Sequence, residues 1–254
     1  MEKQTISVVL ATFNEEGNIA ACLESVKDLA SEIVVVDGSS KDHTVDIAKK
    51  YSAKVKVTTN KPIFHINKQM AIDMAKSDWI LQLDADERVD KSLSDEIKKA
   101  VKDDRFNGYW VPRKNFFLGR FLTKGGQYPD YTLRLYRNGK GNLPQKSVHE
   151  QAVVEGQTGY LKSPLIHIAD PNFSRYIKRW TRYTNLIADE LGEAKIGFNP
   201  YYALKYLIIL PLWWFLLTYI RHKGFVDSWQ GFVFSFFSSL RFPASYLIYL
   251  NRKL

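Results

Sequence analysis

The chain has 254 residues, of which 45% are hydrophobic, 14% aromatic and 25% charged. These values exclude a disordered chain, a collagen-like repeat and a disulfide scaffold, and they leave room for one large domain with or without an appendage. The single cysteine, Cys22, cannot form an intramolecular disulfide, which favours a cytosolic environment. A net charge of +9 is typical of proteins that meet nucleic acid, anionic lipid or phosphorylated substrates.

The positive charge is concentrated in the last third of the chain. Residues 171–254 hold 11 Lys or Arg against 4 Asp or Glu, together with 21 of the 35 aromatic residues. The first 170 residues are close to neutral. We therefore predict two parts, residues 1–170 and residues 171–254, that face different surroundings. The apolar run near the N-terminus is too short for a secretory signal, so none is expected.

Residues 1–85 alternate between strand-like runs and helical patterns. The strand-like runs cover residues 6–11, 33–36, 54–58 and 79–83. The first helical pattern carries Ile19, Leu23 and Val26 at helical spacing, and the last covers residues 67–75. The alternation predicts an α/β fold, with a Rossmann-like, mostly parallel sheet and helices on both faces. Ligands of such sheets bind beyond the carboxyl ends of the strands.

The second half has a less regular pattern. Helices are predicted at residues 91–102 and 175–191, the latter with an apolar stripe at helical spacing. Between them, strands are predicted near residues 108–111, 132–136 and 148–154.

The tail is apolar enough to meet a membrane. Residues 201–220 contain one charge, Lys205, and about 20 apolar residues suffice to cross a bilayer. Residues 225–240 form an amphipathic helix with an aromatic face and a small, polar face, flanked by basic residues. Pro211 and Arg241 interrupt these stretches, which favours monotopic or re-entrant seating over a full span. An oligomer interface and a helical cap on the core are the alternatives.

Two carboxylates follow the strand at residues 79–83. Asp84 and Asp86 are separated by one residue at the carboxyl edge of the predicted sheet. Such oxygen ligands suit Mg²⁺ or Mn²⁺ shared with a diphosphate, where the cation would offset charge on a leaving phosphate. An ordinary acidic loop is the alternative interpretation.

The first two strands also end in residues suited to a nucleotide. Asp37 can accept hydrogen bonds from a base or a ribose, or it can organise a turn, since Gly-Ser-Ser follows. Phe13 can stack on a nucleobase, or it can belong to the core. Neither a Gly-x-Gly-x-x-Gly nor a P-loop motif follows the first strand, which argues against a dinucleotide cofactor or a P-loop.

Three motifs in this order, at residues 8–15, 35–44 and 83–88, resemble glycosyltransferase family 2. Its members are inverting enzymes of GT-A fold that use nucleotide-sugar donors. Within the family, the chain resembles the branch that builds lipopolysaccharide cores. The residues that carry this closer resemblance are Trp79 and residues 87–89, 128–131, 134–137 and 148–150.

The resemblance implies a nucleotide pocket lined by Thr12, Phe13, Asn14 and Glu15. It implies that Asp37 binds the uracil end of a UDP-sugar. Asp84 would lie near the ribose and a divalent cation, Mn²⁺ or Mg²⁺, with Asp86 as the direct metal ligand. Asn67 and Lys68 would lie near the donor, although the local sequence departs from the commoner Ala-Arg-Asn.

An inverting transfer also needs a general base for the acceptor hydroxyl. The family usually places an acid after a glycine-rich segment, and Asp130 follows Gly125-Gly126 here. Glu150 is the rival candidate. Ion pairs with nearby arginines or lysines are the alternative role for both acids.

We therefore expect transfer of a sugar from a UDP-sugar to a lipid-linked saccharide, in lipopolysaccharide core or other cell-envelope glycan synthesis. The expected location is the cytoplasmic face of the inner membrane, with peripheral or monotopic attachment. A polyprenyl-phosphate glycosyltransferase and a non-catalytic membrane-bound module that binds nucleotide sugars are the alternatives. Nucleic acid is not an expected partner, because the basic residues lie beside aromatic segments rather than along a polar groove.

Overall fold

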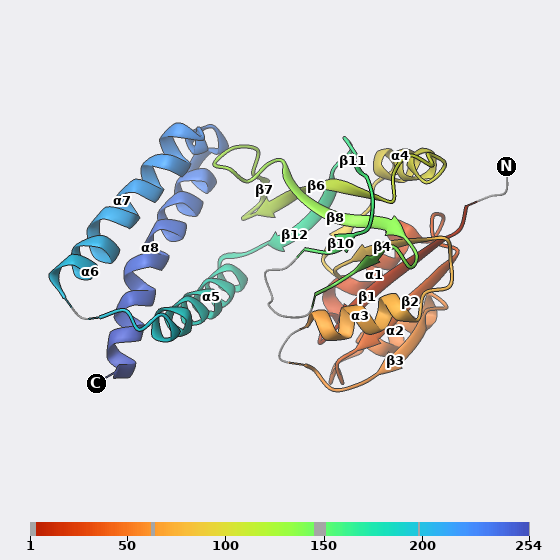
Figure 1. Ribbon diagram of the computed structural model, residues 1–254, viewed down its shortest axis with the longest axis horizontal. Coiled ribbons are helices and arrows are strands. Elements are labelled where there is room, and N and C mark those ends of the chain that lie inside the picture. Colours follow the sequence, from red (N-terminus) through yellow and green to blue (C-terminus); the bar gives the residue numbers. More distant parts are fainter. Residues whose placement is uncertain (1–3, 62–63, 145–150, 198, 254) are drawn as a thin grey trace. The chain divides into compact units, whose positions relative to one another are not determined.

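The computed structural model describes residues 4–61, 64–144, 151–197 and 199–253 (Figure 1). The chain divides into two compact units. Unit 1 comprises Met1–Arg113 and Tyr131–His167, and unit 2 comprises Lys114–Asp130 and Ile168–Leu254. Unit 2 therefore contains a segment from the middle of the chain in addition to the basic, aromatic tail.

Unit 1 begins with strands and helices in alternation. They are β1 (Ile6–Thr12), α1 (Glu16–Val26), β2 (Glu32–Asp37), α2 (Thr44–Lys50), β3 (Lys54–Val57), α3 (His65–Asp73) and β4 (Trp79–Leu83). β1 pairs in parallel with β2 and with β4, and β2 pairs in parallel with β3. The predicted order of strands and helices over this part of the chain is confirmed.

The remaining strands make the sheet mixed. They are β5 (Glu87–Arg88), β6 (Gly108–Phe117), β7 (Arg120–Phe121), β8 (Asp130–Arg137), β9 (Gly141–Asn142), β10 (Val153–Val154), β11 (Thr158–Tyr160) and β12 (Leu165–Asp170). The main path runs β3-β2-β1-β4-β8-β6-β12-β5, with β7 and β11 paired to β6. β8 is antiparallel to β4, and β12 is antiparallel to β5, so the parallel order holds for the first four strands.

Helices cover both faces of the sheet, as predicted. Val8 and Leu10 of β1 pack in the same cluster as the buried residues of α1, α2 and α4 (Lys91–Ala100). Val9, between them, packs in a second cluster with residues of α3. Successive side chains of a strand point to opposite faces, so a strand covered on both faces is apolar at most positions.

Unit 2 is mainly helical. Its helices are α5 (Phe173–Glu193), α6 (Pro200–Leu204), α7 (Leu210–Phe215) and α8 (Ser228–Lys253), with the π-helical turns η1 (Lys205–Ile209) and η2 (Leu216–Arg221) and the 3₁₀ turn η3 (Gly224–Asp227). From α6 to η2 the chain forms one helix, Pro200–Arg221, which lies beside α8 (Figure 1). We call these two helices and the turn between them the aromatic hairpin.

The expected interruptions do not break these helices. Pro211 lies inside the helix Pro200–Arg221, directly after η1. Proline lacks the N–H of the regular i to i−4 bond, and a π-helical turn is one way in which a helix accommodates that loss. α8 likewise continues through Arg241 and Pro243 to Lys253.

Candidate functional site

The strand register brings the three sequence motifs to one edge of the sheet. Thr12 pairs with Asp37, and Leu10 pairs with Leu83, so β1, β2 and β4 end nearly level. Asp84 follows β4 directly, and β1 lies between β4 and β2. Asp37 and Asp84 therefore belong to the same carboxyl edge, which is where α/β sheets bind their ligands.

Asp37 organises the turn that follows β2. Its side chain is fully buried and accepts hydrogen bonds from Thr12 Oγ1 (2.9 Å), Ser40 N–H (2.7 Å) and Ser40 Oγ (2.6 Å). The turn role considered for Asp37 is therefore present. A carboxylate has about four acceptor sites, so these three bonds occupy most of them, and the role of Asp37 at the uracil end stays a prediction.

The loops after β1 and β2 hold each other in place. Asn14 N–H donates to Ser40 Oγ (2.8 Å), and Glu15 N–H donates to Thr44 Oγ1 (2.8 Å). Asn14 has a φ of 55°, a left-handed conformation that asparagine tolerates. Phe13 precedes it with 40% of its surface exposed, so its ring is accessible to a planar ligand.

Asp84 lies in a buried cluster of charges. Lys68 Nζ forms an ion pair with Asp84 Oδ1, and Arg134 Nη2 donates to Asp84 Oδ2 (2.7 Å) and to Glu87 Oε1 (2.8 Å). Burial by itself would raise the pKa of Asp84, but the charges of Lys68 and Arg134 hold that pKa well below its ordinary value. Asp84 is therefore ionised, and each of its oxygens faces a cation.

The turn between Asp84 and Glu87 is held on both sides. Glu87 Oε2 accepts a hydrogen bond from Asp84 N–H (2.8 Å). Arg88 donates to the carbonyl of Ala85 (2.7 Å) and to the carbonyl of Asn18 in α1 (2.9 Å). Because these bonds tie the turn to a neighbouring helix, Asp86 within the turn is positioned before any ligand arrives.

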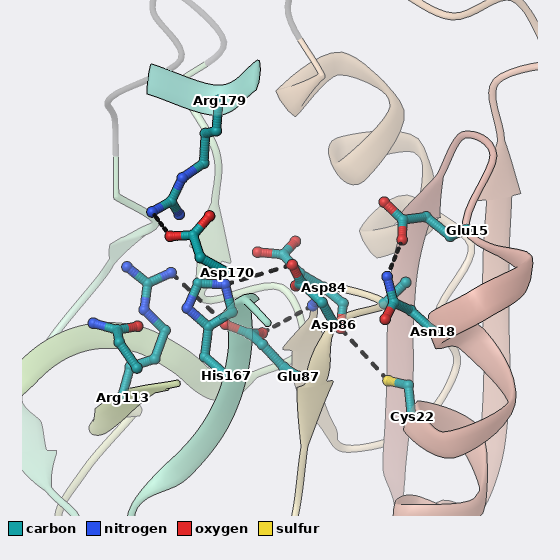
Figure 2. A network of polar contacts seen from close by, with 12 residues as sticks. Glu15, Asn18, Cys22, Asp84, Asp86, Glu87, Arg113, His167, Asp170 and Arg179 are labelled. Atoms are coloured by element: carbon teal, nitrogen blue, oxygen red, sulfur yellow. Dashed lines mark hydrogen bonds and ion pairs between the residues drawn. The ribbon is translucent and has the colours of Figure 1, made fainter. Parts of the chain in front are cut away.

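Asp86 is directed to a different partner. His167 Nε2 lies 3.6 Å from Asp86 Oδ2, and the two side chains point toward one another in Figure 2. His167 reaches this position because β12 pairs with β5, where His167 lies opposite Glu87. His167 stands in an ordinary apolar strand pattern far along the chain, so no local sequence signal marks it as a site residue.

Asp86 and His167 fit a divalent cation better than Asp84 does. Within the described ranges, no group of three or more His, Cys, Asp and Glu side chains could hold a metal ion. Mg²⁺ and Mn²⁺, however, are commonly held by one or two protein ligands together with substrate phosphates. The carboxylate of Asp86 suits that role, with the imidazole of His167 beside it, whereas both oxygens of Asp84 already face cations.

Asn67 and Lys68 lie near the start of α3, and both are buried. Asn67 Nδ2 donates to the carbonyl of Thr59 (3.1 Å). Its Oδ1 has no hydrogen-bond partner among the residues that the structure describes. An open, buried acceptor is costly unless a ligand satisfies it, so Asn67 can receive an N–H or O–H group.

The two candidate bases are Asp130 and Glu150. Asp130 begins β8 and belongs to unit 2, where its Oδ2 accepts a hydrogen bond from Asn115 Nδ2 (3.3 Å). Glu150 lies outside the described residues. The assignment of the base to Asp130 or Glu150 stays a prediction.

The fold, an α/β sheet with carboxylates at its carboxyl edge, is of GT-A type. Residues 7–168 match the family described as Glycosyl transferase family 2, and the chain belongs to this family. The lipopolysaccharide core biosynthesis glycosyltransferase LpsC of Rhizobium meliloti is 30% identical over 94% of this chain and 92% of its own length. An uncharacterized glycosyltransferase of Rickettsia typhi is 29% identical over 90% of this chain and 80% of its own length.

Solved structures share the fold at lower sequence identity. The mannosyltransferase PcManGT from Pyrobaculum calidifontis, in complex with GDP-Man and Mn²⁺, has a TM-score of 0.59 and is 12% identical, over 100% of this chain and 89% of its own. S. aureus TarS 1-349, in complex with UDP-GlcNAc, has a TM-score of 0.53 and is 20% identical, over 88% of this chain and 76% of its own.

Proposed function

We propose that this chain transfers a sugar, with inversion, from a UDP-sugar to a lipid-linked saccharide at the cytoplasmic face of the inner membrane, in lipopolysaccharide core or other cell-envelope glycan synthesis. The proposal depends on one observation above all. Asp86 meets His167 at the carboxyl edge of the sheet, beside the buried Asp84 cluster, in a member of glycosyltransferase family 2.

The donor would lie across the ends of β1, β2 and β4. Phe13 would stack on the base, and Asp37 would accept a hydrogen bond from the uracil end. The open Oδ1 of Asn67 would take a donor hydroxyl or N–H. Solved relatives of the same fold bind UDP-GlcNAc or GDP-Man, so both nucleotides belong in a donor screen.

The transfer forms a bond from the acceptor oxygen to the anomeric carbon and breaks the bond from that carbon to the diphosphate. The acceptor hydroxyl loses its proton to a carboxylate, for which we propose Asp130, with Glu150 as the rival. Asp86 and His167 would hold a Mn²⁺ or Mg²⁺ ion, which supplies positive charge at the departing diphosphate when it is bound. Lys68 and Arg134 keep Asp84 ionised and fixed beside it.

A lipid-linked acceptor is supported by unit 2 and by the relative LpsC. The helix Pro200–Arg221 is long and apolar enough, by length and composition, to cross a membrane. α5 carries exposed basic side chains, including Lys178 and Arg182, that suit a phosphorylated acceptor. LpsC is described as a glycosyltransferase of lipopolysaccharide core biosynthesis.

Asp86→Asn tests the proposal. With the chain in detergent and an extract of lipid-linked saccharides as acceptor, we expect turnover to fall by roughly 10²-fold or more, because the amide is a poorer ligand for the cation. His167→Gln should weaken Mn²⁺ binding in the presence of UDP, measured by calorimetry. Product mass identifies the sugar and the acceptor.

Asp104→Asn is the matched control, because Asp104 is an exposed carboxylate whose ion-pair partner is Arg137. It should change turnover less than twofold, since a surface ion pair contributes little. Full turnover of the Asp86 variant, unaffected by a chelator, would refute the role of Asp86. A chain that binds UDP and Mn²⁺ without any transfer would favour the non-catalytic alternative.

A further inference from the structure

The aromatic hairpin buries small polar side chains of α8 and exposes several of its large aromatic side chains. On α8, Ser235 and Ser239 are buried, while Trp229, Phe232 and Phe236 are 56%, 44% and 41% exposed. The small residues allow α8 to pack closely on its neighbours, as in membrane helices. In water this arrangement would leave large rings hydrated, so the outer face suits an apolar medium.

The partner helix continues the same surface. In the helix Pro200–Arg221, every fourth position from Leu204 to Ile220 carries an exposed aliphatic side chain. These side chains form a stripe that consists of Leu204, Ile208, Leu212, Leu216 and Ile220. Their exposed fractions lie between 48% and 58%. Residues four apart share one face of a helix, so the stripe runs straight along the hairpin.

The turn of the hairpin is bound to a polar loop of the same unit. Asp227 is buried, and its carboxylate accepts hydrogen bonds from Thr123 N–H (2.9 Å), Thr123 Oγ1 (2.8 Å) and Lys124 N–H (2.7 Å). The carbonyl of His222 accepts a bond from Gly125 N–H (2.9 Å). The turn is therefore anchored to the segment that follows β7.

The rest of α8 is bound to α5 and to the residues that directly follow α5. Trp180 Nε1 donates to the carbonyl of Phe237 (2.7 Å), and Tyr249 Oη donates to the carbonyl of Ile196 (2.5 Å). Arg252 pairs with Asp189 near the end of the helix (2.6 Å). Contacts therefore cover one side of α8 over about 25 residues, roughly 38 Å, while the other side stays exposed.

We propose that the aromatic hairpin lies flat in one leaflet, with its exposed stripe in the lipid, and that the helix Pro200–Arg221 does not cross the bilayer. This inference rests on the membrane association in the proposed function. A crossing would carry Asp227 and the loop bound to it through the hydrocarbon, where polar backbone and charge are costly. Basic side chains at the turn, including Arg221 and Lys223, fit anionic headgroups at the edge of the stripe.

The position of the turn tests the flat arrangement. In the full chain with Cys22→Ala, single cysteines are placed at the turn (Lys223→Cys) and at the end of α5 (Glu193→Cys), both exposed positions. With a membrane-impermeant maleimide, we expect both cysteines to react in inside-out inner-membrane vesicles and neither to react in intact spheroplasts. A turn cysteine that reacts from the opposite side to the α5 cysteine would overturn the inference.

The stripe itself is tested by flotation with vesicles of phosphatidylethanolamine and phosphatidylglycerol, with pure phosphatidylcholine as the uncharged comparison. Leu212→Glu should weaken binding to the anionic vesicles at least tenfold. Val57→Glu is the matched control, because Val57 on β3 is 57% exposed and Leu212 is 58% exposed. Its binding should stay within twofold of the unmodified chain. Equal binding by both variants would overturn the inference.

If the chain does not associate with membranes at all, the flotation experiment gives a different result. If the unmodified chain does not float with either kind of vesicle and sediments as a dimer that Leu212→Glu dissociates, the stripe binds a second copy of the chain. That result would overturn membrane association itself. A floating chain whose turn cysteine reacts from the far side overturns only the flat arrangement.

Discussion

Arg134→Met removes the cation at the centre of the buried charge cluster. The Arg134 side chain is 7% exposed and that of Glu87 is 0% exposed. After the substitution, Asp84 keeps Lys68, but the cation that the structure places next nearest to Glu87 is Arg113, at 3.9 Å. Removing one partner of a buried ion pair costs about 3–5 kcal/mol, a large part of the about 5–15 kcal/mol that stabilises a typical domain.

Lys140→Met provides the scale for that cost. Lys140 pairs with Glu155 at 3.1 Å, but the two side chains are 44% and 77% exposed. Such a pair contributes about 0–1 kcal/mol. We therefore expect the variant of Arg134 to lose about 3 kcal/mol more than the variant of Lys140.

Urea unfolding at pH 7 in detergent, followed by tryptophan fluorescence and circular dichroism, measures both losses. The double variant Arg134→Met with Glu87→Gln removes the cation together with the carboxylate that would otherwise lose its ion-pair partner. Its loss of unfolding free energy should be about 2 kcal/mol smaller than the sum of the losses of the two single variants, since the effects of substitutions in contact are not additive. If Arg134→Met costs no more than Lys140→Met, the cluster is hydrated and the argument from burial fails.

Three further substitutions test other parts of the chain. Burial raises the pKa of Glu32, but Lys54 and two hydrogen bonds lower that pKa to about 2. Glu32 therefore stabilises the fold above pH 4.5, and this stabilisation is lost as the pH falls toward 2. Glu32→Gln should remove about 2 kcal/mol of that pH dependence, measured by urea unfolding between pH 6 and about 2.5. Gly231→Ala would place a Cβ 1.9 Å from the carbonyl oxygen of Gly224 and should lower the stability of the fold by about 2–3 kcal/mol. Gly17→Ala meets open space in α1 and should raise the stability by about 0.5–1 kcal/mol. Thermal unfolding compares the two variants, and equal effects would contradict the packing at the turn.

Local patterns were sufficient to predict the edge of the sheet that carries the motifs. A strand buried on both faces is mostly apolar, so its end is visible where polar residues gather, as at Thr12, Asp37 and Asp84. Parallel strands end at the same edge, so three such ends predict one site without knowledge of the full topology. The predicted helices on both faces follow from the same alternation.

Partners from distant parts of the chain could not be predicted in this way. His167 approaches Asp86 because β12 pairs with β5, and Arg134 approaches Asp84 because β8 pairs with β4. Neither pairing leaves a local pattern, since it depends on the order of strands in the sheet. The burial of Arg134 between two carboxylates was therefore not predicted.

The orientation of α8 shows a second limit of periodicity. The pattern separates an aromatic face from a face with Ser235 and Ser239, but it does not say which face meets protein. The small, polar face is buried and the rings of Phe232 and Phe236 are exposed. The direction is decided by the neighbouring helices, because small side chains permit close packing and large rings do not.

The charges of the buried cluster bear on the chemistry at the sheet edge. Lys68 and Arg134 contribute two positive charges, and Asp84 and Glu87 contribute two negative charges, so these four side chains sum to zero. A neutral cluster can position the turn, but it offers no net positive charge to a diphosphate. That charge has to come from outside these four side chains. Asp86, which lies against His167 and is not one of these four side chains, is therefore the carboxylate at which we place the divalent cation.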